Sequence, residues 1–384
     1  MGFLVEKYQK YSNIQNIQNI QIMILVTGGA GFIGSHFVLD WFDKNLNPNF
    51  HNQQIIVYDA LTYAGNLQNL NAVCKEPNFV FIHGSIADRD LLAKTLYKYR
   101  PKWVINFAAE SHVDRSIAGA GDFINTNIVG TFTLLEAVRT YFNSMIPGEE
   151  TQSFRFLHVS TDEVYGSLSP NDPPFAETHQ YQPNSPYSAS KAASDHLVRA
   201  WHHTYGIPCL TSNCSNNYGG LQFPEKLIPL IIHNALRLKD LPIYGDGQQI
   251  RDWLFVKDHC SALRLILEKG KVGEVYNIGG NSEKTNLQVV NTICEKLDQI
   301  KPRADGKSYK TQIKFVKDRP GHDRRYAINA TKLQRELQWK PSETFESGIE
   351  KTILWYLDEQ NKTWLENVIS GDYQNWIKQQ YKCK

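Results

Sequence analysis

The sequence predicts an α/β fold: a Rossmann-type doubly wound parallel sheet with a smaller C-terminal α/β substrate-binding lobe. Three observations predict it. After Met23, short β-branched runs alternate with helix-length segments, which is typical of βαβ units and a parallel sheet. A glycine-rich turn follows the first run. From about residue 215 prolines interrupt a less regular pattern, so we expect a lobe over the carboxyl edge of the sheet, where ligands bind.

The expected strands are buried apolar runs at residues 23–27, 55–58, 79–82, 103–107 and 155–160. Segments of helix length lie between them. Residues 143–153, rich in Pro, Gly, Glu and Ser, are predicted to form a surface loop before the fifth strand.

Composition divides the chain into three parts. Residues 1–22 contain a repeated Asn-Ile-Gln triplet and form an N-terminal extension of low complexity. Residues 23–214 are expected to form the Rossmann domain. Residues 215–384 form mainly the substrate-binding lobe, and a return of this segment to the Rossmann sheet remains open.

Charge and composition exclude several classes of protein. Lys+Arg 41 against Asp+Glu 39 gives a formal net charge of +2, too balanced for binding nucleic acid or an anionic membrane by bulk electrostatics. No run approaches the ~18 apolar residues of a membrane span, and no secretory signal is visible, so we expect a cytoplasmic protein. The six cysteines form no Cys-x-x-Cys pair, which predicts reduced thiols and no metal site.

The glycine-rich turn spans residues 27–34, between the first strand and a helix expected from near Ser35. The turn lets the backbone approach a pyrophosphate, whose charge then faces the helix N-terminus. Asp59 ends the second strand, where a carboxylate accepts hydrogen bonds from ribose hydroxyls and repels a 2′-phosphate. The motif therefore predicts NAD rather than NADP; a turn that serves packing alone is the alternative. The glycines concerned are Gly28, Gly31 and Gly34.

Tyr187 and Lys191 are four residues apart, so on a helix they share one face. A nearby ammonium favours the phenolate and should lower the pKa of the tyrosine, which could then take a proton from a sugar hydroxyl during hydride transfer. With 19 tyrosines the spacing alone can arise by chance. The specificity comes from its position after the fifth strand.

Thr161, Asp162 and Glu163 follow the fifth strand at the expected ligand edge. Buried carboxylates are costly unless they are used or paired. Adjacent Asp and Glu can serve as acid and base on one substrate. The alternative is a solvated turn in which Asp162 caps a helix.

Further motifs follow in order, and with them the chain from Met23 to about Tyr381 resembles the extended short-chain dehydrogenase/reductases, and among them the dTDP-glucose 4,6-dehydratases. The motifs are residues 59–66 (Asp-Ala-Leu-Thr-Tyr-Ala-Gly-Asn), residues 108–116 (Ala-Ala-Glu-Ser-His-Val-Asp-Arg-Ser), residues 216–219 (Asn-Asn-Tyr-Gly) and residues 318–322 (Asp-Arg-Pro-Gly-His).

The resemblance implies a lyase that converts dTDP-glucose to dTDP-4-keto-6-deoxyglucose with tightly bound NAD, a step of deoxysugar biosynthesis such as the rhamnose pathway. Tyr187, held by Lys191, takes the proton of O4 while C4 gives its hydride to the cofactor. Glu163 then removes the C5 proton, Asp162 protonates the departing C6 hydroxyl, and the hydride returns to C6. Thr161 bonds near O4 and orients the hexose.

The resemblance also implies binding residues. For the cofactor they are Gly28, Gly31, Phe32, Ile33, Gly34, Asp59, Ala60, Leu61, Thr62, Ser85, Ile86, Ala108, Ala109, Glu110, Ser111, Thr126, Tyr187, Lys191 and Asn217. For the nucleotide-sugar substrate they are His112, Thr161, Asn216, Lys226, Pro242, Ile243, Tyr244, Arg251, Asn286, Arg319, His322 and Tyr381. Two guanidiniums, Arg251 and Arg319, suit a diphosphate, although a lone arginine is more often a solvated surface group. His112 is equally consistent with a loop or core histidine that makes its hydrogen bonds within the protein.

Two positions depart from the family pattern. Ser85-Ile86 stands where an Asp usually meets the adenine, and Gly220-Leu221 stands where Pro-Tyr usually follows residues 216–219. The second departure puts the local loop shape in question.

Several alternatives stay open. A sugar-nucleotide 4-epimerase or a UDP-glucuronate decarboxylase shares the turn and the Tyr/Lys pair but usually has Ser at the position of Asp162. An NAD-binding scaffold without activity would be favoured by loss of Tyr187 or Lys191, and both are present. Thymidine and uridine differ by one methyl group, so a UDP-glucose 4,6-dehydratase is also open. The resemblance implies a homodimer packed through helices near residues 122–142 and 187–205.

Overall fold

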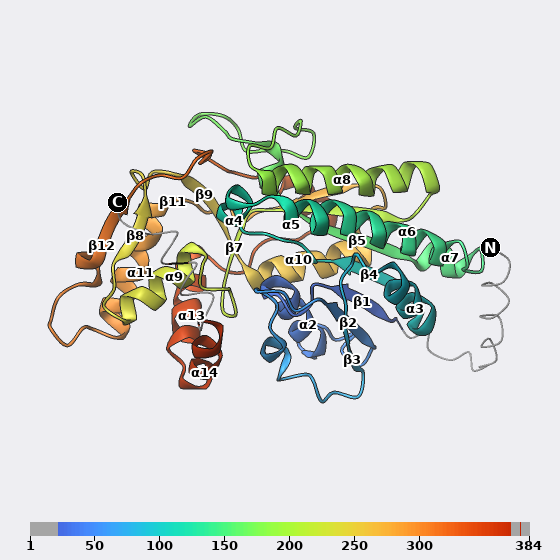
Figure 1. Cartoon of the computed structure of the whole chain (residues 1–384), viewed down its shortest axis with the longest axis horizontal. Helices are drawn as coiled ribbons and strands as arrows, with labels where there is room; N and C mark the ends of the chain where they lie inside the picture. Colours follow the sequence, from blue (N-terminus) through green and yellow to red (C-terminus); the bar gives the residue numbers. More distant parts are fainter. Residues whose placement is uncertain (1–21, 370–376, 378–384) are drawn as a thin grey trace.

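The computed structural model describes residues 22–369 and residue 377. The N-terminal extension, apart from Ile22, and the predicted substrate residue Tyr381 lie outside the described residues, as does Cys383. Two lobes are visible in Figure 1, a large one built on a parallel sheet and a smaller one at the opposite end of the long axis.

A seven-stranded sheet forms the large lobe, in the order β10-β6-β5-β4-β1-β2-β3, and its neighbouring strands are parallel. This confirms the predicted Rossmann-type sheet. The strands are β1 (Ile24–Thr27), β2 (Ile55–Asp59), β3 (Phe79–His83), β4 (Trp103–Asn106), β5 (Arg155–Thr161), β6 (Cys209–Cys214) and β10 (Val275–Ile278). The first five lie within one residue of the predicted runs. Strand β10 comes from the segment after residue 215, so the chain does return to the sheet.

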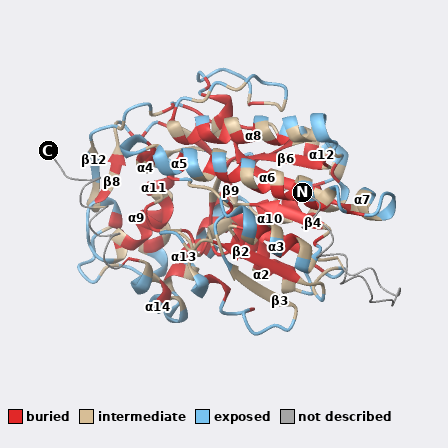
Figure 2. Cartoon of the chain, turned by 45° about the vertical axis from the view of Figure 1, so that its right-hand side comes forward, coloured by how far each residue is buried: buried red, intermediate tan, exposed pale blue. Residues whose placement is uncertain are grey.

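Helices cover both faces of the sheet because its strands are apolar on both sides. On one face, α3 (Arg89–Tyr99), α6 (Thr131–Phe142) and α8 (Pro186–Tyr205) pack over residues such as Leu25, Ile56 and Val104. On the other, α2 (Phe32–Phe42), α10 (Val256–Lys269) and α12 (Thr331–Leu337) pack over Ile24, Val26 and Val57. Figure 2 shows the buried strands between exposed helix surfaces.

The small lobe has its own apolar core. Helices α9 (Leu227–Leu236), α11 (Asn286–Ile300), α13 (Phe345–Leu357) and α14 (Glu359–Val368) contribute to it. Its strands form two small sheets. One is β11-β9-β7 (Glu283–Thr285, Ile250–Phe255, Asn216–Tyr218), and the other pairs β12 (Ile313–Val316) with β8 (Leu241–Tyr244).

The remaining helical elements are short. They are η2 (Leu67–Leu70), α4 (Val113–Ala118), α5 (Gly121–Phe123), the π-helix η3 (Ile124–Gly130), α7 (Glu149–Ser153), η4 (Asp162–Tyr165) and η5 (Tyr309–Gln312). The prediction of a loop throughout 143–153 was wrong for α7. There the Gly148 N–H donates to the Thr151 hydroxyl at 3.1 Å, and two glutamates in the first turn favour the helix N-terminus.

Candidate active site

The glycine turn packs tightly between β1 and α2. Gly28 has a φ of +70°, and a Cβ there would lie 2.5 Å from the Ala108 nitrogen. A Cβ on Gly34 would lie 2.2 Å from the Gly28 carbonyl oxygen. Helix α2 begins at Phe32, three residues before the predicted start, and Gly31 at its N-cap offers no side-chain cap. First-turn N–H groups therefore remain for an anion, which fits a pyrophosphate.

Asp59, the last residue of β2, lies directly under this turn. Its Oδ2 accepts the Ala30 N–H at 2.9 Å, and its Oδ1 accepts the Leu61 N–H at 2.8 Å. Burial raises the pKa of Asp59, while these two N–H donors oppose the rise. Each oxygen keeps a lone pair for a ribose hydroxyl. The turn and this carboxylate together fit NAD.

The Ser85 departure has a local explanation. The Ser85 hydroxyl accepts the Ala87 N–H at 3.2 Å, and the Ser85 carbonyl accepts the Tyr58 hydroxyl at 3.0 Å. Ile86 is buried. The serine thus stabilises its own turn after β3.

Asn127, which the sequence analysis did not single out, makes hydrogen bonds that hold the segment after β4. Asn127, in the π-helix beside the predicted Thr126, accepts the Glu110 N–H at 2.9 Å and donates to the Glu110 carbonyl at 2.9 Å. It also donates to the Ser190 hydroxyl of α8 at 2.8 Å. Asn127 therefore ties residues 108–111 to the helix that carries Tyr187 and Lys191. Asn127 is one of three consecutive polar residues, 125–127, and nothing in the sequence singles it out.

Tyr187 and Lys191 lie in the first turns of α8, whose N-terminus is capped by Ser185 and begins with Pro186. Both side chains are buried. The Lys191 ammonium donates to the Val159 carbonyl at 2.9 Å. Burial lowers the pKa of Lys191.

The sequence predicted that Lys191 lowers the pKa of Tyr187. With only the protein's own groups around the phenol, that prediction was wrong. Burial raises the pKa of Tyr187 well above its usual value, and the Glu163 carboxylate adds to the rise. A hydrogen bond with the Thr161 hydroxyl opposes it. Ionisation of the phenol therefore depends on positive charge brought close to it.

The three polar residues after β5 are placed differently from one another. Thr161 is the N-cap of η4, and its hydroxyl accepts the Glu163 N–H at 3.3 Å. Asp162 is 2% exposed and its Oδ2 has no hydrogen-bond partner within the described part of the chain. These findings exclude the solvated turn with Asp162 as cap. The Thr161 hydroxyl lies 3.5 Å from Asp162 Oδ1.

The two carboxyl groups have different surroundings. Burial raises the pKa of Asp162 well above its usual value, and Glu163 and Asp252 add to the rise. Burial also raises the pKa of Glu163, but Arg319, Arg251 and Lys226 oppose it. Asp162 is thus suited to hold a proton and Glu163 to accept one.

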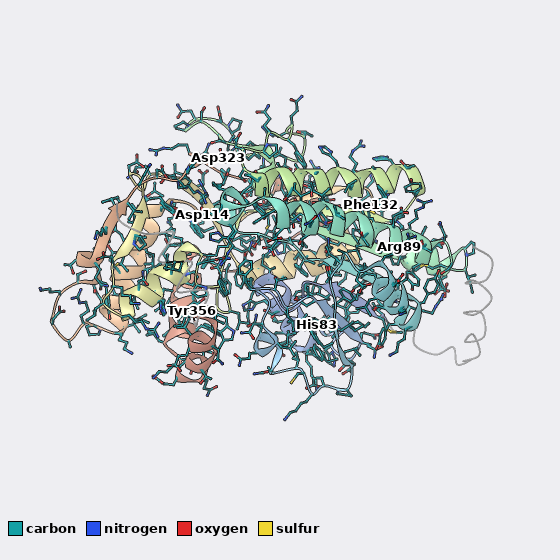
Figure 3. The ribbon with its side chains drawn as sticks, in the orientation of Figure 1. His83, Arg89, Asp114, Phe132, Asp323 and Tyr356 are labelled. Atoms are coloured by element: carbon teal, nitrogen blue, oxygen red, sulfur yellow. The ribbon has the colours of Figure 1, made fainter. Side chains whose placement is uncertain are left out.

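Cationic residues of the small lobe are brought to this edge. Arg319 donates to Asp114 Oδ1 at 2.7 Å, and although burial opposes it, this guanidinium holds the pKa of Asp114 below its usual value. Arg251 donates to the Asp323 carbonyl at 3.0 Å and lies 4.2 Å over the Tyr326 ring. Figure 3 labels Asp114 and Asp323, which lie where the two lobes meet.

Other predicted substrate residues have partners of their own. The Lys226 ammonium donates to the Ser111 carbonyl at 2.9 Å, and the Tyr244 hydroxyl, from β8 with Pro242 and Ile243, donates to Asp114 Oδ2 at 3.1 Å. His322 Nδ1 lies 2.6 Å from Asp318 Oδ1. Asn286 begins α11, where its N–H donates to the Gln249 carbonyl at 3.0 Å, and the Gln249 amide donates to Asp318 Oδ2 at 3.0 Å.

His112 and the two asparagines of β7 complete the predicted set. His112 caps α4 by accepting the Arg115 N–H at Nδ1, as expected for a histidine that is hydrogen-bonded within its own loop. Burial lowers the pKa of His112 well below its usual value. Asn216 Oδ1 is buried with no hydrogen-bond partner among the described residues. Asn217 Oδ1 lies 3.0 Å from His259 Nδ1.

The Gly220-Leu221 departure reflects packing against α13. A Cβ on Gly220 would lie 2.6 Å from the Trp355 ring, and the Gly220 carbonyl faces His36 Nε2 at 2.9 Å. Leu221 has a φ of +61°. Trp355 therefore occupies the space that a larger residue at 220 would need.

Within residues 22–369 and 377, no group of three His, Cys, Asp or Glu side chains could hold a metal ion. No helix in that part of the chain is long and apolar enough to cross a membrane. The described cysteines, Cys74, Cys209, Cys214, Cys260 and Cys294, are free thiols.

Comparisons with known proteins agree with this geometry. Residues 25–352 match the family described as GDP-mannose 4,6 dehydratase. A dTDP-glucose 4,6-dehydratase of Xanthomonas campestris pv. campestris (strain B100) is 58% identical over 91% of this chain and 96% of its own length.

Two solved structures are also similar. One, from Bacillus anthracis in complex with NAD, is 46% identical over 90% of this chain and 99% of the other, with a TM-score of 0.77. The second, from Streptomyces venezuelae with NAD bound, is 43% identical over 90% and 100%, with a TM-score of 0.81. Both are described as dTDP-glucose 4,6-dehydratases.

Proposed function

The chain belongs to the GDP-mannose 4,6 dehydratase family, and from that premise we propose that it is an NAD-dependent dTDP-glucose 4,6-dehydratase, a lyase that forms dTDP-4-keto-6-deoxyglucose and water. The observation that carries the proposal is the pair Asp162 and Glu163 at the end of β5, one buried with a strongly raised pKa and the other facing three cations. Elimination of water needs an acid and a base of this kind on one sugar.

NAD bound here would supply the hydride acceptor for C4 and the hydride donor for C6. The glycine turn and Asp59 would hold its pyrophosphate and adenosine ribose. Tyr187 takes the proton of the O4 hydroxyl. Because burial raises the pKa of Tyr187, Lys191 on the same helix face must supply positive charge near the phenol.

The elimination falls to the two carboxyl groups. Once C4 is a ketone, the C5 hydrogen is acidic, and Glu163 removes it. The raised pKa of Asp162 favours its protonated form, and Asp162 gives its proton to the C6 hydroxyl, which leaves as water. Glu163 then returns the proton to C5.

One turnover changes the protonation of two residues, and both must return to their starting state before the next turnover. Tyr187 ends with one proton more than it began with, and Asp162 ends with one fewer. The Thr161 hydroxyl lies 3.5 Å from Asp162 Oδ1 and is hydrogen-bonded to Tyr187. Thr161 thus lies between the group that gained a proton and the group that lost one.

The nucleotide sugar would span both lobes. Arg251 and Arg319 offer guanidiniums for the diphosphate, and buried atoms without a partner in the described chain, Asn216 Oδ1 and Arg319 Nε, can bind substrate atoms. We therefore propose that the hexose binds at the sheet edge and the nucleotide toward the small lobe.

A homodimer through α6, α8 and the π-helix is part of the proposal. Exposed apolar side chains gather there, including Val129, Phe132 and Tyr205. Phe132 packs edge-on against Trp201, so the two helices present a continuous apolar surface. Sedimentation of the purified protein, with Phe132→Glu as the disrupting variant, tests this point.

The activity is tested by incubating the purified protein with dTDP-glucose and, separately, UDP-glucose. Mass spectrometry should show loss of one water, and alkali should develop the absorbance of a 4-keto sugar. We expect dTDP-glucose to react faster. A sugar of unchanged mass with the galactose configuration would contradict the dehydratase and indicate an epimerase. Faster reaction of UDP-glucose would correct the nucleotide alone.

A further inference from the structure

A buried acidic residue that the proposed reaction does not use lies behind Lys191. Asp195 is one helical turn after Lys191 on α8 and is 5% exposed. Its Oδ2 accepts the Ser160 hydroxyl at 2.8 Å and the Tyr181 hydroxyl at 3.1 Å. Its Oδ1 has no well-aligned hydrogen-bond partner within the described residues, and His158 Nε2 lies 3.4 Å from it. Burial of a carboxylate oxygen without a well-aligned partner is costly, so this oxygen calls for an explanation.

His158 stands between this oxygen and Lys191. Its Nε2 lies 3.4 Å from Asp195 Oδ1 and 3.4 Å from the Lys191 ammonium. The imidazole is fully buried on β5, and burial and the lysine charge lower its pKa to about 4. His158 is therefore neutral at physiological pH.

The hydrogen bonds around His158 determine which nitrogen carries its proton. The Asn106 amide donates to Nδ1 at 3.1 Å, and the Asn106 carbonyl accepts the Thr27 hydroxyl at 2.6 Å. Nδ1 is thus an acceptor and Nε2 carries the hydrogen. The Ser194 hydroxyl donates to the Lys191 carbonyl at 2.8 Å, so its oxygen is left to accept from Nε2 at 3.2 Å. The N–H edge of the ring faces Ser194 and Asp195.

Lys191 itself needs an opposing charge. Burial lowers the pKa of its ammonium, and Asp195 is the leading group that acts in the opposite direction. The other titratable groups beside it are the neutral His158 of β5, the Cys214 thiol of β6 and the Tyr187 phenol one turn earlier. Burial raises the pKa of Cys214, so that thiol is neutral as well.

We propose that Asp195, acting across His158, is a positioning residue that holds the Lys191 ammonium in place and in its charged form. The proposal rests on the role given to Lys191 in the proposed function. It assigns to Oδ1, which faces the His158 ring, an electrostatic role that an amide of the same shape could not perform.

The first experiment compares Asp195→Asn with the parent holoenzyme. Two groups must keep a proton at alkaline pH, Asp162 for the elimination and Lys191 for the oxidation at C4, so the pH dependence is followed on the oxidation alone, as nicotinamide reduction in a single turnover. Without the Asp195 carboxylate, the alkaline limb of that rate against pH should move down by about one unit, with the acid limb unchanged. Activity should recover as the pH is lowered. If the alkaline limb of Asp195→Asn stays at the parental pH, the proposal is overturned. This holds both for a variant that is less active at every pH and for one that is as active as the parent.

A matched control is Asp258→Asn. Asp258 is also buried, on α10, and accepts the Ser342 and Glu343 N–H groups at 3.0 Å each. Its loss should lower stability without moving the alkaline limb. If Asp195→Asn does not fold, Asp195→Glu retains the charge, and we expect its alkaline limb at or above the parental pH. A limb below the parental pH in that variant would contradict the proposal.

A second readout does not depend on turnover. Urea unfolding is measured for the parent and Asp195→Asn from neutral to alkaline pH. The lost attraction exists only while Lys191 is charged, so the stability deficit of Asp195→Asn should shrink as pH rises through the pKa of Lys191. The deficit of Asp258→Asn should stay constant. A constant deficit in both variants would show that Asp195 is merely structural, even if the proposed substrate fails to react.

Discussion

The edge of the sheet and the small lobe hold their polar groups in different ways. At the edge, Thr161, Asp162 and Glu163 are consecutive, and Tyr187 and Lys191 share one helix face. In the lobe, Arg319 is paired with Asp114, 205 residues earlier in the chain. The reacting groups are therefore concentrated in short segments, whereas recognition is assembled from distant ones by folding. The edge should determine rate and the lobe should determine affinity.

The largest expected effect belongs to the edge. Asp162→Asn keeps the shape of the acid but cannot give a proton to the C6 hydroxyl, so kcat should fall by about 10²–10⁴-fold with little change in KM. Steady-state assays of keto-sugar formation measure this. Asp258→Asn is the matched control. A loss below tenfold would mean that another group is the acid, and the comparison of the two regions would fail.

A second effect concerns the boundary between the lobes. His259 on α10 is fully buried against Asn217, and burial lowers its pKa to about 3. Its contribution to stability is present above the unfolded pKa, near 6.5, and is lost as pH falls toward 3. His259→Gln should therefore lose less stability than the parent between pH 7 and 4, by roughly 3 kcal/mol. Urea unfolding at the two pH values tests this. Equal losses in the two proteins would contradict it.

The lobe should affect binding more than turnover. Arg319→Met removes a charged hydrogen-bond donor and leaves Asp114 buried without its main cation, so KM for the nucleotide sugar should rise by about 10–100-fold. We expect kcat to change less than KM. A fall in kcat equal to that of Asp162→Asn would place Arg319 among the reacting groups.

The smallest effect is expected at an exposed ion pair of the same lobe. Arg324 is half-exposed and pairs with Asp246 at 2.9 Å. Exposed pairs contribute little because water screens them. Arg324→Met should change KM by less than about twofold and is the control for Arg319→Met. A large effect here would mean that the substrate reaches farther over the lobe than proposed.

This contrast also explains what the sequence could predict. The glycine turn, the five strands and the residues after β5 are local patterns, and the structure has them within a few residues of their predicted places. The partners of Lys191 and Arg319 were not predictable, because His158, Asp195 and Asp114 become their neighbours only through the fold. The pKa of Tyr187 was misjudged for the same reason: helix spacing reports the nearby lysine but not the depth of burial.

The most direct test of the edge as the reacting region is turnover of dTDP-glucose in D₂O. Glu163 removes the C5 proton and returns one from a carboxyl group that exchanges with solvent. The product should therefore be one water lighter than the substrate, apart from isotope, and carry one solvent deuterium at C5, seen by mass spectrometry and NMR. A product of unchanged composition, or a dehydrated product without deuterium at C5, would contradict the roles assigned to Asp162 and Glu163.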